Sequence, residues 1–380
     1  MDRLCRAPIN SSLWNIRTKV KPTPEIRSRD LPFNKPSATV LVSASNGANG
    51  GNGAINIKHI SEQKDRLLLT AVKRALYTTE QEQGPGQVAF RVAYQGIPGA
   101  YSEEAALATH PGCQGLPCHT YAAALQSVES RVADRAILPV ESTVEGSIHR
   151  NYDLLLDHRL CIVGEIHYPV YYCLLAPPGV DREEIKRVMA HPLALSQCRR
   201  TLKTLGLANV SMQTSDDTAG AAECVSRNGP RGTAAIASAR AAEIYGLRVL
   251  ARGIQDESCN FTRFLILARD PIVPTADRPC KTSIVVAHDG ELGVLFKVLS
   301  AFSFRDINLT KLESRPTKNR PLRVVGDGPA FVKEFHCVFY IDFEASLSDR
   351  RVQNALTELK EFASFLRVLG SYSVDATPKA

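Results

Sequence analysis

Between residues 90 and 269 the sequence alternates short apolar runs with longer stretches of helical periodicity. The runs RAILPVE, LCIVGEI and TRFLILAR have the length and composition of buried strands, whereas ALSQCRRTLKTLG and TAGAAECVSR have the pattern of helices. Strands that alternate with helices are typical of α/β domains with largely parallel sheets. We therefore expect an α/β domain with a largely parallel sheet over residues 87–270.

The order of the expected elements changes after a polar, proline-rich stretch at residues 270–279. Strand, helix, strand, strand, helix and strand then follow one another up to residue 374. This βαββαβ order is that of ferredoxin-like domains. The sequence therefore predicts a linker at residues 271–281 and a second domain at residues 282–374.

The first 86 residues differ in composition from the rest of the chain. Among the first sixty, nine Lys and Arg residues stand against three acidic residues, which accounts for +6 of the formal net charge of +7. The segment also contains the low-complexity run NGANGGNGA and too few apolar residues to form a core. Its basic, hydroxylated and acid-poor character is typical of an organelle transit peptide, and a disordered tail without a targeting role is the alternative.

Charge and cysteine content exclude several classes of function. The remaining chain is close to neutral, which does not favour a nucleic-acid partner, and no apolar run reaches the roughly 18 residues that a membrane helix needs. The ten Cys residues form no CxxC pair and no zinc-ligand spacing with His, so we interpret them as reduced structural thiols. We expect neither a metal nor an organic cofactor.

Three turns rich in Gly, Ser and Thr precede expected helices, at residues 95–102, 139–147 and 215–220. Hydroxyl groups and free backbone N–H groups at a helix N-terminus bind anions such as carboxylates. Ser, Thr and Asp are also the preferred helix caps, and ordinary capping is the simpler explanation for any one of these turns alone.

A fourth polar group, Asn260, Thr262 and Arg263, precedes a strongly apolar strand. At a sheet edge near a cleft, a Thr hydroxyl could donate a proton and an Arg could hold a carboxylate through two parallel hydrogen bonds. The alternative is the solvated start of an ordinary strand.

Six segments, in one consistent order, resemble the prephenate dehydratase family in its plant arogenate dehydratase branch. They are AYQGIPGAYSEEAA, LPVESTVEGSIHRNYDLLL, HPLALSQC, DDTAGAAE, AIASARAAEIYGL and NFTRFLILAR. GELGVLFKVL and TKLESRP are similar to the ACT regulatory domain that these enzymes carry. The resemblance implies a two-lobed, periplasmic-binding-protein-like catalytic domain at residues 87–270, an ACT domain at residues 282–374, and a plastid transit peptide within residues 1–86.

The resemblance also implies roles for individual residues. It gives Thr262 the role of the acid and Arg263 a substrate contact, and Ser142 and Thr143 are further catalytic candidates. Ser142 replaces the Asn that is more usual in the family, and Glu145 stands where plant members often have Gly. The expected substrate-binding residues are Gln95, Gly96, Gly99, Tyr101, Ser102, Glu141, Gly146, Ser147, Thr218, Ala219, Ser238, Asn260 and Phe264. The expected effector-binding residues are Gly293, Val294, Leu295, Glu313, Ser314, Arg315 and Pro316.

The function implied by the resemblance is decarboxylative dehydration of L-arogenate to L-phenylalanine, inhibited by phenylalanine. Prephenate as the main substrate, with phenylpyruvate as product, is one alternative, and a non-catalytic phenylalanine-binding regulator is another. Glu145 and Asp217 are the candidates for distinguishing the ammonium group of arogenate from the keto group of prephenate. We further expect a homodimer or homotetramer, no nucleic-acid or membrane partner, and a location in the chloroplast stroma. An ACT domain that only dimerises is the alternative to regulation.

Overall fold

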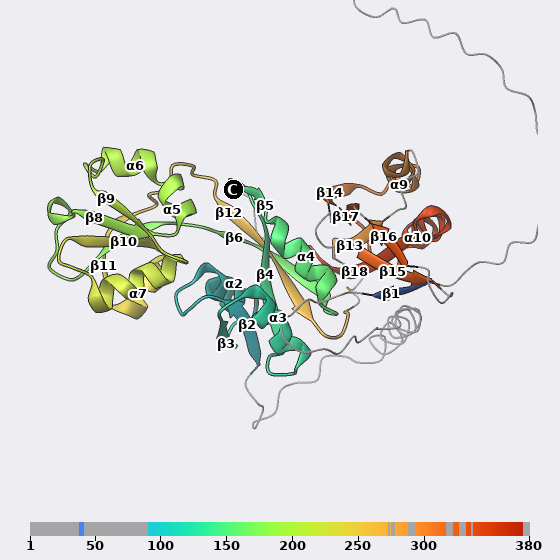
Figure 1. Cartoon of the computed structure of the whole chain (residues 1–380), viewed down its shortest axis with the longest axis horizontal. Coiled ribbons are helices and arrows are strands. Elements are labelled where there is room, and N and C mark those ends of the chain that lie inside the picture. Colours follow the sequence, from blue (N-terminus) through green and yellow to red (C-terminus); the bar gives the residue numbers. More distant parts are fainter. Residues whose placement is uncertain are drawn as a thin grey trace, which may run out of the picture. The chain divides into compact units, whose positions relative to one another are not determined.

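The computed structural model describes residues 38–41, 90–272, 274, 278–287, 293–316, 322–326, 332–335 and 337–374 (Figure 1). The expected leader at residues 1–86 lies outside the described residues except for strand β1 (Ala38–Leu41), and its targeting role stays a prediction. β1 pairs with β15 (Leu322–Gly326), which pairs with β16 (Val332–Phe335). Among the residues that the structure describes, no helix is long and apolar enough to cross a membrane.

The first lobe is built on a six-stranded sheet, in which five strands follow the order β3-β2-β4-β12-β6 and β5 lies off this path. Helices α2 and α3 pack on this sheet, and the short strand β5 pairs with β4 (Figure 1). The elements are β2 (Arg91–Gln95), α2 (Tyr101–Thr109), β3 (Gln114–Cys118), α3 (Tyr121–Glu129), β4 (Arg135–Ser142), β5 (Gly146–Ser147), α4 (His149–Asp157), β6 (Cys161–Pro169) and β12 (Phe261–Ala268).

The second lobe is built on a sheet in the order β11-β7-β10-β8-β9 and has its own apolar clusters on the two sides of β10. Its central strand β10 is buried at every position, as its sequence TAAIA requires. The elements are β7 (Cys173–Ala176), η1 (Arg182–Glu184), β8 (Arg187–Ala190), α5 (Pro192–Gln197), α6 (Arg199–Thr204), β9 (Ser211–Thr214), α7 (Thr218–Asn228), β10 (Thr233–Ala237), α8 (Ala239–Tyr245) and β11 (Arg248–Arg252).

Two strands connect the lobes. β6 leads directly into the second lobe and β12 returns from it, and where they meet the Val170 N–H donates to the Asn260 carbonyl at 2.8 Å. β12 comes back from the second lobe and inserts between β4 and β6, and it runs antiparallel to both. β7 is likewise antiparallel to β10 and β11, and the short β5 is antiparallel to β4. The other pairs of the two lobes are parallel. The expectation of largely parallel sheets is therefore wrong, since half of the main pairings in each lobe are antiparallel.

The C-terminal domain contains a four-stranded antiparallel sheet in the order β14-β17-β13-β18. With helices α9 and α10 inserted after its first and third strands, it has the expected βαββαβ order, which confirms the ferredoxin-like arrangement. The elements are β13 (Cys280–Ala287), α9 (Val294–Ser303), β14 (Leu309–Pro316), β17 (Cys337–Phe343), α10 (Arg350–Phe362) and β18 (Phe365–Ser373).

Both faces of the C-terminal sheet are covered. Ile284 and Ile341 pack with the residues of α9 and α10. Val285 and Tyr340, which point to the other face, belong to a cluster that also contains residues of the first lobe. Because strand side chains alternate between faces, this two-sided burial explains why every residue of β13 is buried.

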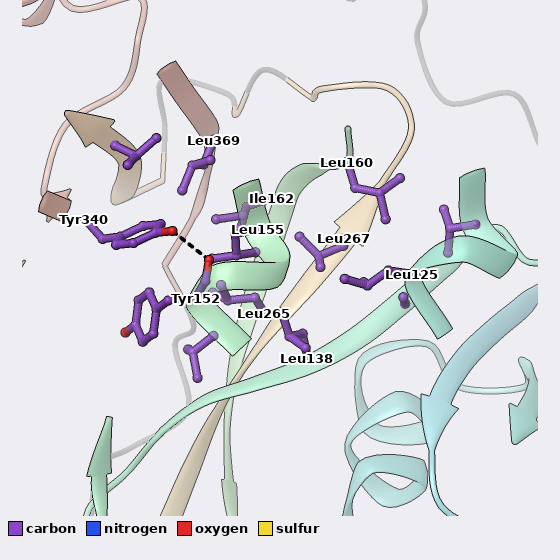
Figure 2. Close-up of a cluster of buried hydrophobic side chains, with 14 of the residues drawn as sticks. Leu125, Leu138, Tyr152, Leu155, Leu160, Ile162, Leu265, Leu267, Tyr340 and Leu369 are labelled. Atoms are coloured by element: carbon purple, nitrogen blue, oxygen red, sulfur yellow. Dashed lines mark hydrogen bonds between the residues drawn. The ribbon is translucent and has the colours of Figure 1, made fainter. Parts of the chain in front are cut away.

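The first lobe and the C-terminal domain share one hydrophobic core (Figure 2). Leu265 and Leu267 of β12 lie in it together with Leu369 of β18, and the Tyr340 hydroxyl donates to the Tyr152 carbonyl at 2.8 Å. At Gly370 the approach is so close that a Cβ atom would clash with the carbonyl oxygen of Ile162. These two parts of the chain therefore pack as a single body.

Candidate active site between the two lobes

Thr262 lies near the start of β12, where the chain returns from the second lobe. Its direct neighbours across the sheet are Ser142 at the end of β4 and Tyr168 near the end of β6. Directly opposed residues of antiparallel strands place their side chains on the same face. Three hydroxyl-bearing side chains from three strands therefore share one face of the sheet at the junction of the lobes. The Tyr168 hydroxyl donates to the Glu104 Oε2 of α2 at 2.9 Å.

The turn after β4 uses its own hydroxyl groups locally. The Ser142 Oγ accepts hydrogen bonds from the backbone N–H groups of Val144 and Glu145, at 3.3 and 3.4 Å. The Thr143 Oγ1 accepts from the Phe261 N–H at 3.0 Å and donates to the Cys259 carbonyl at 3.1 Å. Thr143 thus ties the turn to the returning strand.

A cavity of about 310 Å³ lies beside the turn after β4, and residues of both lobes line it. The Gln197 amide connects its two sides: its Nε2 donates to the Glu145 Oε1 at 3.1 Å, and its Oε1 accepts from the Asn260 Nδ2 at 3.0 Å. The volume is at the lower end of the range for small-molecule sites. The lining residues are Val144, Glu145, Ser196, Gln197, Arg200, Gln255, Asp256, Glu257 and Asn260.

Gln197 and Arg200 were not among the residues predicted for the site. Gln197 does belong to the segment HPLALSQC, so its place in that segment was the available signal. The Arg200 guanidinium pairs with Glu257 at 2.6 Å and with Asp256 at 3.6 Å, so its charge is balanced at the cavity edge. A larger hollow of about 550 Å³ lies at residues 278–280 and 344–349 of the C-terminal domain and contains none of the predicted substrate-binding residues.

The first glycine-rich turn packs against the second lobe. Gly99 has a φ of +92°, and a Cβ atom there would lie 2.9 Å from the Ala241 backbone, so only glycine fits. The Ser238 Oγ donates to the Gly99 carbonyl at 3.1 Å and accepts from the Ala241 N–H at the start of α8. Ser238 thus acts as both a helix cap and a link between the lobes. Gln95 and Gly96 begin this turn, and Gly96 also has a positive φ.

The same region contains an ion pair across the lobes. The Glu103 Oε2 accepts from the Gly99 N–H at 2.7 Å and from the Arg240 Nε at 3.1 Å. The Tyr101 hydroxyl donates to the Tyr171 carbonyl at 2.8 Å. These contacts hold the N-terminus of α2 against the second lobe.

The third predicted turn begins α7. Asp217 caps the helix by accepting from the Gly220 N–H, and Thr218 and the buried Ala219 form its first turn. Burial raises the pKa of Tyr121 to about 12, although its hydrogen bond with Ser102 opposes the shift, and the nearby Asp217 adds to the rise. Ser102 and Asp217 therefore lie near one tyrosine, from opposite lobes.

The two histidines near the predicted turns have structural contacts. The His191 Nδ1 accepts from the Leu193 N–H at the start of α5, at 3.3 Å. Burial lowers the pKa of His191, and Asp217 and Asp216 oppose this effect. His149 pairs with Glu313 of the C-terminal domain at 3.2 Å.

Arg263 and Phe264 are not directed to the same place as Thr262. The Arg263 guanidinium lies on the opposite face of the sheet and pairs with Glu165 at 2.8 Å and with Asp342 at 2.7 Å. Phe264 is 2% exposed and packs among apolar residues that include Ile137 and Ile266. The structure therefore brings Thr262, Ser142, Thr143, Glu145 and Asn260 to the junction of the lobes but places Arg263 and Phe264 elsewhere.

The predicted effector residues lie on two elements of the C-terminal domain. Gly293, with a φ of +76°, precedes α9, which begins with Val294 and Leu295. β14 contains Glu313, Ser314, Arg315 and Pro316, and its residues are alternately half-buried and exposed.

The half-buried residues of β14 contact the first lobe. The Ser147 Oγ donates to the Glu313 Oε2 at 2.5 Å, and the Arg315 Nη2 pairs with Asp153 at 2.6 Å. The Lys311 Nζ contacts the Glu141 Oε1 at 3.0 Å and the Ser147 Oγ at 2.7 Å. Glu141, Gly146 and Ser147 were predicted to bind substrate, and the structure shows Glu141 and Ser147 in contact with β14 instead of with the cavity lining.

Comparison with known proteins agrees with this arrangement. A family model described as prephenate dehydratase matches residues 92–272. An Arabidopsis thaliana protein named arogenate dehydratase/prephenate dehydratase 6, chloroplastic, is 62% identical over 289 residues, which are 76% of this chain and 70% of that protein. A prephenate dehydratase from Arthrobacter aurescens, solved in complex with L-Phe, is 30% identical with a TM-score of 0.66, over 74% of this chain and 89% of that one.

A further solved structure with a similar fold belongs to a protein that is described by another activity. GqqA, described as a novel type of quorum quenching acylase, is 33% identical with a TM-score of 0.64, over 75% of this chain and 98% of that one. Because one fold can host different activities, fold similarity alone does not choose between them. The 62% identity to the plant dehydratase and the match to the family model identify the activity as that of a dehydratase.

The chain belongs to the prephenate dehydratase family. It is a dehydratase, and therefore a carbon–oxygen lyase, of the plant arogenate/prephenate type, with a two-lobed catalytic domain and a C-terminal ACT domain. The name of the Arabidopsis relative supports a plastid location. The predictions of family, fold class and enzyme class are confirmed.

Proposed function

We propose that this chain converts L-arogenate to L-phenylalanine by decarboxylative dehydration, with the conversion of prephenate to phenylpyruvate as the alternative main activity. The observation that carries the proposal is the position of Thr262. Its neighbours across the sheet are Ser142 and Tyr168, at the junction of the two lobes. A substrate at this junction would meet the hydroxyl groups of Thr262 and Ser142, which can donate a hydrogen bond to its leaving hydroxyl group.

The reaction requires a proton donor at the hydroxyl oxygen of the substrate. The ring of arogenate carries a carboxylate on one carbon and a hydroxyl group on the carbon across the ring. Protonation of the hydroxyl group lets it leave as water while the electron pair of the breaking C–CO₂ bond enters the ring, which becomes aromatic. A positioned proton donor contributes roughly a hundred- to ten-thousand-fold to such a step. Thr262 is a weak acid, so we propose that its hydroxyl positions and relays the proton.

A carboxylate in the cavity lining supports the proposed preference for arogenate over prephenate. Glu145 lines the cavity and Asp217 caps α7, so Glu145 is the better placed of the two candidates for contacting the substrate's amino group. A carboxylate there would attract the ammonium group of arogenate and would offer no hydrogen to the keto oxygen of prephenate. A Glu145→Gln variant assayed on both substrates tests this preference through the ratio of kcat/KM values.

The deciding experiment assays the purified full chain on arogenate and prephenate side by side, with and without phenylalanine. Phenylalanine formed from arogenate, with little phenylpyruvate from prephenate, supports the main proposal, and the reverse supports the alternative. Turnover of neither substrate, with phenylalanine still bound, would leave a non-catalytic regulator. Ser142→Asn, which introduces the residue more usual in the family, would then show whether Ser142 is the cause.

We also propose that phenylalanine binds the ACT domain through Gly293, Val294, Leu295 and the exposed side of β14, and that it inhibits turnover. The support is that the related Arthrobacter protein was solved with L-Phe. The contacts of Glu313 with Ser147 and of Arg315 with Asp153 connect the ACT domain directly to β5 and α4 of the first lobe.

The remaining proposals concern assembly, location and domain limits. Phe296 and Phe304 of the ACT domain are 73% and 81% exposed, and large apolar side chains at a surface support an interface between copies in a homodimer or homotetramer. We propose the chloroplast stroma as the compartment. We keep residues 1–86, 87–270, 271–281 and 282–374 as the proposed leader, catalytic domain, linker and ACT domain. β13 begins at Cys280, so Cys280 and Lys281 of the proposed linker already belong to the sheet of the ACT domain.

A further inference from the structure

A buried cluster of charged residues joins the catalytic lobe to the ACT domain. The Arg263 Nε contacts the Glu165 Oε2 at 2.8 Å, and its Nη1 contacts the Asp342 Oδ2 at 2.7 Å. The Lys281 Nζ contacts the other oxygen of Glu165 at 2.7 Å. The Arg263 Nη2 also donates to the Tyr372 hydroxyl at 3.1 Å. Two positive and two negative groups therefore pair with one another, with one acid and one base from each domain. The partly exposed Glu141 of the first lobe also lies 3.8 Å from the Arg263 Nη1.

The cluster is well shielded from solvent. The side chains of Arg263, Glu165, Lys281 and Asp342 are 7%, 0%, 8% and 12% exposed. Buried ion pairs with several hydrogen bonds need a defined geometry, because removal of one partner leaves an uncompensated charge in a medium of low polarity. The cluster therefore fixes the position of the Arg263 guanidinium relative to both domains.

The position of Arg263 also determines that of Thr262. The two residues are adjacent on β12, so their side chains point to opposite faces of the sheet. Directly after Arg263, the pairing of β12 with β4 shifts register, from Arg263 opposite Glu141 to Phe264 opposite Pro139. At such an irregularity the backbone ladder alone does not define the strand's path, and a side-chain anchor on one face can orient the neighbour on the other.

We propose that Asp342 and Lys281 of the ACT domain are positioning residues for the dehydratase reaction: through Arg263 and Glu165 they hold Thr262 at its place opposite Ser142. In this assignment Arg263 acts as an anchor and not as a substrate contact. The ACT domain thereby completes the catalytic strand even when no effector is bound. This inference rests on the proposed function, because its first readout is turnover of arogenate.

The test compares Asp342→Asn with the wild-type full chain. A displacement of about 1 Å at a reacting group costs about a hundredfold in rate, so we expect kcat to fall by about that factor. We expect KM to change by less than about threefold, because the substrate contacts remain. Amide hydrogen exchange at residues 261–265 should become faster in the variant, which shows the loosened strand directly.

The matched control is Glu344→Gln, the same chemical change two residues further along the chain. Glu344 is exposed and accepts from the Asn308 Nδ2 within the ACT domain at 2.7 Å. We expect wild-type kcat, KM and exchange for this control. Asp342→Glu, which restores the charge, should recover part of the lost kcat.

The outcomes separate this proposal from its alternatives. A folded Asp342→Asn variant with wild-type kcat and exchange would overturn it. A rise in KM with unchanged kcat would also overturn it, because Arg263 would then act in substrate binding. If Asp342→Asn does not fold, Lys281→Gln replaces it with the same expectations. A wild-type chain that turns over neither arogenate nor prephenate contradicts the proposed function, whereas the exchange comparison still decides the positioning.

Discussion

Thr262 and Arg263 are one position apart along β12, but they contact different parts of the molecule. Because side chains alternate along a strand, Thr262 shares a face with Ser142 and Tyr168, and Arg263 shares the other with Glu165. A shift of the strand by one residue would exchange these two faces. The register of β12 against its neighbours is therefore a condition for catalysis as well as for folding.

The hydroxyl group of Thr262 can be tested by two substitutions. Thr262→Ala should lower kcat by about a hundredfold or more, because the departing hydroxyl group loses its positioned donor. Thr262→Ser keeps the hydroxyl and should retain most of the activity. Steady-state kinetics with arogenate measures both, and near-normal turnover by the alanine variant would rule out the proposed role.

Glu165 makes the stability of the folded protein depend on pH. Burial alone would raise its pKa, but the charges of Arg263 and Lys281 lower the pKa below its ordinary value of 4.5. A lowered pKa in the folded state stabilises the protein above the pKa of the unfolded chain, and this contribution is lost as the pH falls through the folded-state pKa. The wild type should therefore lose stability as the pH falls below about 4.5.

Glu165→Gln provides the comparison for this pH dependence. At neutral pH the variant should be less stable by about 3–5 kcal/mol, since Arg263 and Lys281 lose their shared partner. In acid the difference between the two proteins should become smaller. Urea unfolding at a series of pH values measures it, and a difference that stays constant with pH would contradict the assignment of an ionised Glu165.

At the scale of elements, β18 can approach β6 closely only because residue 370 is a glycine. An alanine there would place its Cβ against the carbonyl oxygen of Ile162. Gly370→Ala should therefore destabilise the protein by about 1–3 kcal/mol and lower activity. Ser373→Ala, on the same strand, serves as the control. Thermal unfolding compares the two, and equal transition temperatures would show that the contact is unimportant.

The sequence predicted the order of the elements well, because apolar runs and helical periodicity are local properties. The ACT domain elements between residues 280 and 373 occur as expected. The direction of β12 could not be predicted, since it depends on the place to which the chain returns after the second lobe. Local sequence patterns do not determine the direction of a strand within its sheet.

The site was predicted in part, for a similar reason. Motif resemblance located Thr262 and Ser142, which the sheet brings together. It could not show that Arg263 pairs with Asp342 or that Glu313 meets Ser147, because these contacts join residues far apart in the sequence. Lys281 gave one signal, because it precedes the apolar run IVVA of the same strand, and a lysine that is buried there needs a partner.

At the scale of the molecule, the shared core should make the first lobe and the ACT domain unfold together. Residues of β4, β12, β13 and β17 belong to one apolar cluster, whereas the second lobe has separate clusters. Native-state hydrogen exchange should therefore give similar opening free energies for β12 and β17. Peptides of β10 report on the second lobe for comparison. A β17 that opens far more easily than β12 would show that the two parts are independent.

The hydrogen bond between Val170 and Asn260 means that the second lobe begins and ends at one point. Residues 170–260 can therefore be treated as a cassette with adjoining ends. Exchange of this cassette with that of a relative of different substrate preference would leave both junctions in place. Such chimaeras would assign the choice between a keto acid and an amino acid to one lobe, and they show how a gene could acquire a new specificity by recombination within a single reading frame.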